Sequence, residues 1–243
     1  MSPLEISTGD INAESPCLVQ SKSLQWKYTG ISMAAAGEKS YHHGDLKQAL
    51  VEAGIAELEE KGLELLSLRS IAARVGVSHT APKNHFDGLR GLRTAIAAEG
   101  FRRHALAMRA GLEGEPSGKS RLDAACNGYV RFALENPELF KLMFSSVLCN
   151  YEDIELQRAC RTSYEILRGV AHGLDWDKAQ QPGGPWRTEW MLWSMVHGYA
   201  MLLIQGQISR NKDGSLMFDV VGLMPDFGYR TDAATSLPEP FTD

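Results

Sequence analysis

The spacing of apolar residues along the chain predicts a protein built of helices. Between Asp45, a candidate N-cap, and Gly62, a candidate stop signal, apolar residues recur at steps of three and four and so share one helix face. Further helical patterns occur at about 88–111, 120–135, 137–148, 153–174 and 186–209. The alternation typical of a strand occurs only weakly, at 217–221. The sequence therefore predicts an all-α fold.

Residues 66–86 have the pattern of a helix-turn-helix. Ser67 is a candidate N-cap for a short helix that ends at Gly76, and a glycine there permits a positive φ where the chain reverses. Ser78 follows as the candidate N-cap of a third helix, which we expect to run to about Phe86. In a helix-turn-helix, the N-terminal residues of this last helix enter the major groove of DNA.

The distribution of charge points to an anionic partner for the same part of the chain. The whole chain has a net charge of −5, but residues 66–110 hold eight Lys and Arg against two acidic residues. Such a segment attracts nucleic acid, although a solvated helix face gives the same count. The candidate DNA-binding residues are Ser67, Arg69, Ser78, His79, Thr80, Lys83, Asn84 and His85. Of these, Ser67 is first an N-cap, and His85 either caps its helix or contacts phosphate.

Composition excludes several other classes of protein. The chain is 44% hydrophobic and 23% charged, which is ordinary for a globular protein, and its four cysteines lack disulfide or zinc spacing. The longest apolar stretch, 190–204, is shorter than the ~20 residues that cross a bilayer, and the first residues do not form a signal peptide. We therefore expect a cytoplasmic protein without a membrane partner.

No catalytic or metal-binding motif is present. The sequence lacks a Gly-rich phosphate loop, a nucleophile elbow, HExxH and CxxC. The pair His42–His43 has no third ligand at metal spacing. We expect neither an enzyme nor a bound metal or cofactor.

The helix predicted at 186–209 carries candidate ligand-binding residues. One stripe of residues that recur every four positions consists of Trp193, His197, Met201 and Gln205. Such a stripe is typical of a core or dimer surface as well as of a ligand pocket. His197 is accordingly either a buried structural histidine or an effector contact. The candidate effector-binding residues are Met143, Phe144, Tyr164, Trp193, His197 and Tyr199, the first three by position alone.

Residues 41–100 resemble the tetracycline-repressor (TetR) family of bacterial transcriptional regulators. The resemblance rests on YHHGDL before the first helix, SLRSIAARVGVS across the second helix and turn, and the HF pair at the end of the third. Farther along, ENPELFKLMF and the spacing of Trp193, His197 and Gly198 resemble the ligand-binding domain of a TetR subgroup named for Trp-His-Gly.

Composition and resemblance together give a domain organisation. The polar, irregular composition of 1–40 predicts a disordered tail, and the Pro-, Thr- and Ser-rich composition of 230–243 predicts a frayed one. The resemblance implies a DNA-binding domain at 41–100 and a helical effector-binding and dimerisation domain at 101–229. Met33 is an alternative start of the protein.

The resemblance also implies a mechanism. A homodimer would bind a near-palindromic DNA operator and leave it when a small-molecule effector binds. Alternatives are an activator of the same fold, and an all-α dimeric binding protein with impaired DNA binding. Two features depart from the family. Lys83 stands where a tyrosine is usual, and only about 215–224 is available for the last dimer helix.

Overall fold

The structure is a computed structural model that describes residues 43–114, 118–171, 184–213, 215, 216, 220 and 222. The predicted tails at 1–40 and 230–243, with Met33, lie outside these residues. The described elements are α1 (His43–Lys61), η1 (Leu63–Leu65), α2 (Leu68–Val75), η2 (Ala81–Asn84), α3 (Gly88–Ala110), α4 (Gly118–Glu135), α5 (Pro137–Met143), α6 (Ile154–Ala171) and α7 (Gly184–Ile204), where η marks a 3-10 helix. The all-α prediction is confirmed.

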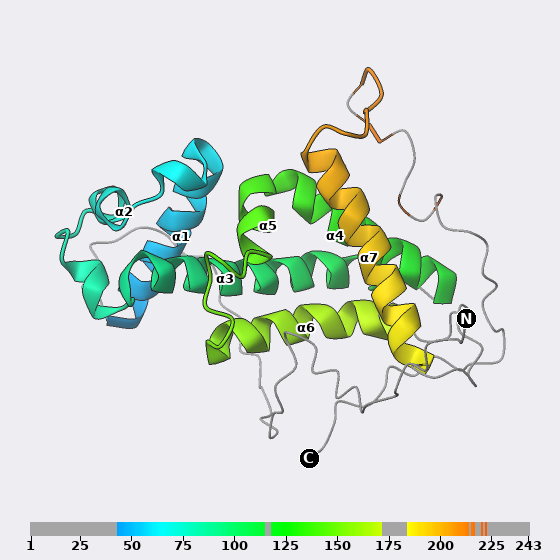
Figure 1. The fold of residues 1–243 in the computed structure, drawn as a ribbon, viewed down its shortest axis with the longest axis horizontal. Helices are drawn as coiled ribbons and strands as arrows, with labels where there is room; N and C mark the ends of the chain where they lie inside the picture. The colour runs from blue at the N-terminus through cyan, green and yellow to red at the C-terminus, as the bar shows by residue number, and fades with distance from the viewer. Residues whose placement is uncertain are drawn as a thin grey trace, which may run out of the picture.

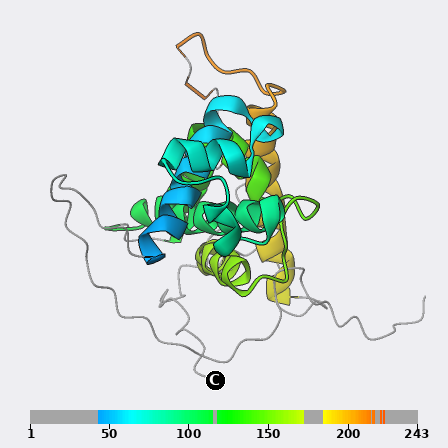
Figure 2. The ribbon, with the colours of Figure 1, turned by 90° about the vertical axis from the view of Figure 1, so that its left-hand side faces the viewer.

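The helices form a head and a body that share one long helix. Figure 1 shows α1, α2 and η2 at one end of the molecule, with α3 running out of this head through the body. In the body α3 packs against α4, α5 and α6, while α7 packs across α4 and α6. Figure 2 looks along the molecule onto the head, with the body behind it. None of the helices in the described ranges is long and apolar enough to cross a membrane.

Small residues let the helices of the body approach closely. A Cβ atom placed on Gly128 of α4 would lie 2.5 Å from the carbonyl oxygen of Ala107 and 2.8 Å from the Cα of Met108, both in α3. A Cβ atom on Gly100 of α3 would meet the Sδ atom of Met143 at 2.7 Å. Real Cβ contacts are longer than this, so the observed packing of α3 against α4 requires glycine at position 128.

The sequence predicted both ends of α2 correctly. Ser67 lies at the N-cap, where its Oγ atom accepts a hydrogen bond from the N–H of Ser70 at 3.2 Å. Gly76 ends the helix with a φ of 78°, the left-handed conformation that glycine adopts without steric cost. Arg74 donates two hydrogen bonds of 2.6 Å to the Glu60 carboxylate, which joins α2 to α1.

The prediction of a helix from Ser78 to Phe86 is wrong. Only the single 3-10 turn η2 forms there. Pro82 has no N–H to donate to the carbonyl of Ser78, which instead accepts the N–H of Ala81 at 3.0 Å. Pro82 and Phe86 are both buried and fix this turn against the head.

Other boundaries differ from those expected. The first helix begins at His43, so Asp45 lies within it instead of capping it. The helix α7 ends at Ile204, before the expected 209, because Gly206 takes a positive φ of 70°. The helix α5 ends at Met143, before the expected 148, where a tight turn joins Ser145 to the carbonyl of Leu142. The helix expected at 215–224 is not formed by the residues described there.

Candidate functional site

The head exposes a polar tip beyond the turn that follows α2. We call the exposed side chains at this turn and in η2 the tip: Ser78, His79, Thr80, Lys83 and Asn84. The hydroxyls of Ser78 and Thr80 lie 3.0 Å apart, and the N–H of Lys83 donates to the carbonyl of Thr80 at 3.1 Å. The tip is therefore ordered by its own hydrogen bonds while its side chains face solvent.

The three remaining candidate DNA-binding residues differ in how exposed they are. Arg69 is exposed on α2. Ser67 is half-buried, and its Oγ atom is engaged as the helix cap and lies 2.6 Å from the Oγ atom of Ser70. His85 is half-buried beside Phe86, with ring centroids 6.3 Å apart. Arg69 is thus better placed than Ser67 or His85 for contact with a partner.

Part of the basic segment is neutralised within the chain. Three of its eight basic residues, Arg74, Arg102 and Arg103, form ion pairs with acidic side chains of α1, α3 and α6. Within the described part of the chain, Arg69 and Lys83 have no ion-pair partner. The positive charges of the head without an ion-pair partner among the described residues therefore include those of Lys83 in the tip and Arg69 on α2.

A second group of candidate residues lies in the body, in a cluster of rings from five helical segments. We call the following residues the aromatic cluster: His104 of α3, Tyr129 of α4, Phe140 and Phe144 in and just after α5, Tyr164 of α6, and Trp193 and His197 of α7. Contacting pairs have ring centroids between 4.2 Å and 6.5 Å apart. This range is typical of aromatic pairs that pack edge to face or at a tilt.

The hydrogen bonds within the aromatic cluster determine which ring nitrogen of His197 carries the proton. The Nε1–H of Trp193 donates to the hydroxyl of Tyr129 at 3.3 Å, and this hydroxyl lies 2.9 Å from Nδ1 of His197. Trp193 can only donate, and Nδ1 is the one acceptor for the Tyr129 proton among the described residues. Tyr129 therefore donates to Nδ1, and the neutral His197 carries its proton on Nε2.

Burial keeps the polar members of the aromatic cluster uncharged. It lowers the pKa of His104 to about 3, with a further contribution from the neighbouring His197. Burial also lowers the pKa of His197 and raises the pKa of the Tyr129 hydroxyl. In each case the apolar surroundings disfavour the charged form. At neutral pH the aromatic cluster thus presents hydrogen-bonding groups without a formal charge.

The structure brings four of the six predicted effector residues together. Phe144, Tyr164, Trp193 and His197 belong to the aromatic cluster, and each is half-buried. Met143 is fully buried and packs against Gly100 of α3. Tyr199 is buried on α7.

Sequence reasoning missed His104, Tyr129 and Phe140. His104 lies in an apolar stripe of α3 between Phe101 and Met108, all three buried. A histidine inside such a stripe is a signal of a buried polar contact, and here its Nδ1 lies 2.8 Å from the Ser163 hydroxyl. Its partners come from other helices, so spacing along α3 could not identify them.

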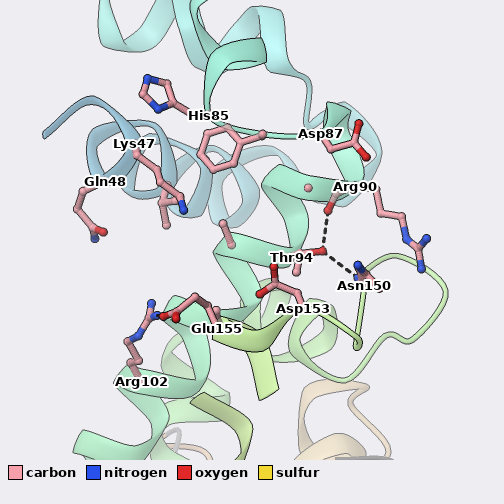
Figure 3. Close-up of a pocket in the computed structure, with 15 residues that line it drawn as sticks. Lys47, Gln48, His85, Asp87, Arg90, Thr94, Arg102, Asn150, Asp153 and Glu155 are labelled. Carbon is pink, nitrogen blue, oxygen red and sulfur yellow. Dashed lines mark hydrogen bonds and ion pairs between the residues drawn. The ribbon is translucent and has the colours of Figure 1, made fainter. Parts of the chain in front are cut away.

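A cleft of about 450 Å³ lies where the head meets the body. Figure 3 shows Lys47 of α1 and His85 on the side of the head, and Asp153 near the start of α6 on the side of the body. Thr94 and Asn150 lie between them. The cleft is lined mainly by polar and charged groups of both signs, and nothing in the sequence predicted it.

Hydrogen bonds join head and body at this cleft and also at a second place. The hydroxyl of Thr94 donates to the carbonyl of Arg90 at 2.8 Å and accepts the N–H of Asn150 at 2.8 Å (Figure 3). Away from the cleft, the Glu59 carboxylate of α1 accepts the N–H groups of Leu139 at 2.7 Å and Glu138 at 3.3 Å. These amides belong to the first turn of α5, so the head supplies a cap for a helix of the body.

The position of the Glu59 carboxylate affects its pKa. Burial raises its pKa, and the two backbone N–H groups partly offset this by stabilising the ionised form. The residue preceding α5, Asn136, makes no side-chain cap hydrogen bond. Glu59 is therefore the side-chain cap described for α5.

The described residues hold no group of three His, Cys, Asp or Glu side chains that could bind a metal ion. His42, one half of the His42–His43 pair, lies outside the residues that the structure describes.

The head and the body form a two-part, all-helical architecture. Residues 122–221 match the family described as "Tetracyclin repressor-like, C-terminal domain". The chain therefore carries a C-terminal domain of the tetracycline-repressor family of transcription regulators. Because proteins of this family are regulators, the expectation that the chain is not an enzyme is confirmed. A comparison with curated protein sequences found no match.

Several solved structures are similar to this one. A protein of unknown function from Rhodococcus sp. RHA1 is 30% identical, with a TM-score of 0.57 over 73% of this chain and 90% of that chain. A fatty acid degradation regulator from Bacillus halodurans is 10% identical, with a TM-score of 0.55 over 70% and 90%. A TetR family transcription regulator from Marinobacter aquaeolei VT8 is 20% identical, with a TM-score of 0.50 over 69% and 87%. The last two similarities concern the fold alone.

Proposed function

We propose that the protein is a repressor that binds DNA through the tip. The observation that carries this proposal is the exposure of the five polar side chains of the tip, one of which is Lys83, beside Arg69 on α2. The charges of Lys83 and Arg69 have no ion-pair partner in the described structure. Unpaired cations suit phosphates, and short polar side chains suit base edges in a groove. The protein then acts where the DNA is, in the cytoplasm.

The proposed DNA-binding domain, 41–100, and the proposed effector domain, 101–229, share α3. We assign the effector site to the aromatic cluster, and Trp193, His197 and Gly198 support membership of the Trp-His-Gly subgroup. Phe140 and Phe144 connect the aromatic cluster to α5, whose first turn is capped by Glu59 of the head. An effector that moves α5 would therefore change the position of the head. Release from DNA requires that the effector favour the arrangement that does not fit the operator.

We also propose that the protein is a homodimer joined through α7. Trp190, Met191 and Leu202 are large apolar side chains of this helix that are exposed, by 42%, 44% and 43%. A Cβ atom on Gly198, in the same helix, would meet nothing within 4 Å. A two-fold contact would cover this face and place two heads on one side of the duplex, as a near-palindromic operator with half-sites ~34–36 Å apart requires.

One observation favours a second candidate function. The 3-10 turn η2 is shorter than the helix that a helix-turn-helix places in the major groove. This feature supports the alternative of a dimeric small-molecule-binding protein with impaired DNA binding.

Binding of the full chain to DNA from upstream of its own gene, measured by fluorescence anisotropy, separates the two candidates. A regulator binds this DNA more tightly than random DNA, and Thr80→Ala and His79→Ala reduce the preference. Lys119→Ala, which removes an exposed charge of α4, is the control and leaves binding unchanged. Equal affinity for both DNAs, unaffected by the tip variants, would exclude the proposed repressor. Light scattering on the same sample tests for twice the mass of one chain.

A further inference from the structure

Two histidine nitrogens in the aromatic cluster lack a hydrogen-bond partner within the described part of the chain. The Nε2 atom of His104 is buried without a partner, on the opposite side of the ring from the bond to Ser163. The Nε2 atom of His197 also has no partner among the described side chains, and this residue is only half-buried. A buried polar group without a partner is costly, and this applies to Nε2 of His104. Nε2 of His197 is a candidate for contact with a ligand because it lies on a half-buried residue and has no partner among the described side chains.

His197 is the better placed of the two to meet a molecule from solvent. Its ring centroid lies 4.5 Å from that of Phe144 and 6.5 Å from that of Trp193, and Tyr164 lies beyond Trp193 at 5.9 Å. All four residues are half-buried. We call these four half-buried residues the accessible side of the aromatic cluster.

The hydrogen-bond direction specifies what His197 can bind. Since Tyr129 donates to Nδ1, the neutral imidazole offers Nε2–H as a donor and has no acceptor left. Tyr129 and Trp193 are positioning residues, because they fix this form of the ring through a chain of hydrogen bonds. A matching ligand must therefore present an acceptor atom.

Local charge narrows the class of ligand further. The charged groups described next to the accessible side are Glu189, which accepts the Tyr164 hydroxyl at 2.7 Å, and Arg168, which pairs with Glu189 at 3.3 Å. Because Arg168 is already paired, an anionic ligand would find no free counter-ion there. A cationic ligand would face the Nε2–H donor. The surroundings favour a ligand without charge.

We propose that the accessible side of the aromatic cluster binds an uncharged aromatic molecule that carries a carbonyl-type oxygen. The ligand ring packs against Phe144 and Trp193, and its oxygen accepts the hydrogen bond from Nε2–H of His197. This inference deepens the proposed function, since the ligand would be the effector, but binding itself does not require DNA.

Isothermal titration calorimetry of the full chain with four probes of similar size tests the proposal. The probes are acetophenone, ethylbenzene, benzoate and phenyltrimethylammonium. Acetophenone should bind about fivefold more tightly than ethylbenzene, the factor expected for one neutral hydrogen bond, and more tightly than either ion. Benzoate or phenyltrimethylammonium as the tightest binder, or no binding of either neutral probe, would overturn the proposal.

Variants at position 197 separate hydrogen bonding from general packing. His197→Gln keeps an N–H donor at about the same reach and should retain the preference for acetophenone over ethylbenzene. His197→Leu should abolish the preference while still binding ethylbenzene, which shows that the aromatic cluster remains folded. Lys119→Leu changes an exposed side chain of α4 outside the aromatic cluster and serves as the control. An unchanged preference in His197→Leu contradicts the proposal, and if that variant fails to fold, the probe series and His197→Gln still decide it.

The two proposals can fail separately. Acetophenone binding without any DNA binding supports the ligand class and removes the repressor. DNA binding that benzoate releases supports the repressor and overturns the ligand class.

Discussion

Removal of the Glu59 carboxylate tests how the head holds the body. In Glu59→Ala, the amides of Glu138 and Leu139 lose their acceptor, and Asn136 makes no side-chain hydrogen bond that replaces it. Loss of a helix cap costs about 1 kcal/mol, with a range of about 0.5–2 kcal/mol. The two N–H groups favour a larger loss, but the burial that raises the pKa of Glu59 offsets part of it, so we expect a loss of about 1 kcal/mol. For a protein of this size, that lowers the melting temperature by roughly 2–4 °C.

Thermal melting followed by far-UV circular dichroism at one fixed protein concentration measures this effect. Glu60→Ala is the matched control, because it removes an exposed carboxylate of the same helix that binds Arg74 of α2 and not α5. Hydrogen exchange at the Leu139 amide should accelerate in Glu59→Ala alone. A melting temperature for Glu59→Ala equal to that of Glu60→Ala, with unchanged exchange at Leu139, would refute the role of Glu59 as a cap.

The tip and two glycines of the helices provide three further predictions. Lys83→Ala should weaken binding to operator and random DNA alike, and the slope of log affinity against log salt should fall by about one for each phosphate that Lys83 neutralises; a weakening on the operator alone would mean that Lys83 binds a base. Thr80→Ala should cost about 1–3 kcal/mol on the operator and relax sequence preference, as a competition assay with mutated operators would detect. Gly128→Ala should lower stability in urea by about 1–3 kcal/mol through overpacking against α3, whereas Gly91→Ala, whose Cβ atom would meet its nearest neighbour at 3.4 Å, should not; equal urea midpoints would contradict this.

The local chemistry of the head explains which of its features were predictable. Ser67 and Gly76 were identified correctly because a cap and a left-handed turn depend on residues close in sequence. The prediction of a helix after Ser78 was wrong because the same local argument gave too little weight to Pro82. Proline cannot donate the hydrogen bond that an α-helix needs at this position. Proline two residues into the 3-10 turn was visible in the sequence as a signal against a longer helix.

Only part of the aromatic cluster could be predicted from the sequence: Trp193 and His197 by their spacing, and Phe144 and Tyr164 by their position in the chain. Trp193 and His197 share one face of α7 by spacing alone, so the sequence could place them together. Their hydrogen-bond partner Tyr129 is 64 residues from Trp193 and 68 from His197 in the chain, and His104 lies farther away still. Contacts of this kind arise from the packing of α3, α4 and α7, which no local pattern specifies.

The short helix α5 links the head to the aromatic cluster. Its first turn is held by Glu59 of the head, and Phe140 belongs to the aromatic cluster, with Phe144 immediately after the helix. Under the proposed function, a ligand changes DNA binding only by the difference in its affinity for the two positions of α5. Ligand-dependent release of about 5- to 150-fold corresponds to about 1–3 kcal/mol of coupling, which is the scale of the cap that Glu59 provides. Glu59→Ala should therefore reduce ligand-dependent release more than it reduces DNA binding without ligand, and anisotropy titrations with and without the ligand compare the two directly. Equal reductions in both would show that the signal reaches the head by another route, such as the bonds between Thr94 and Asn150.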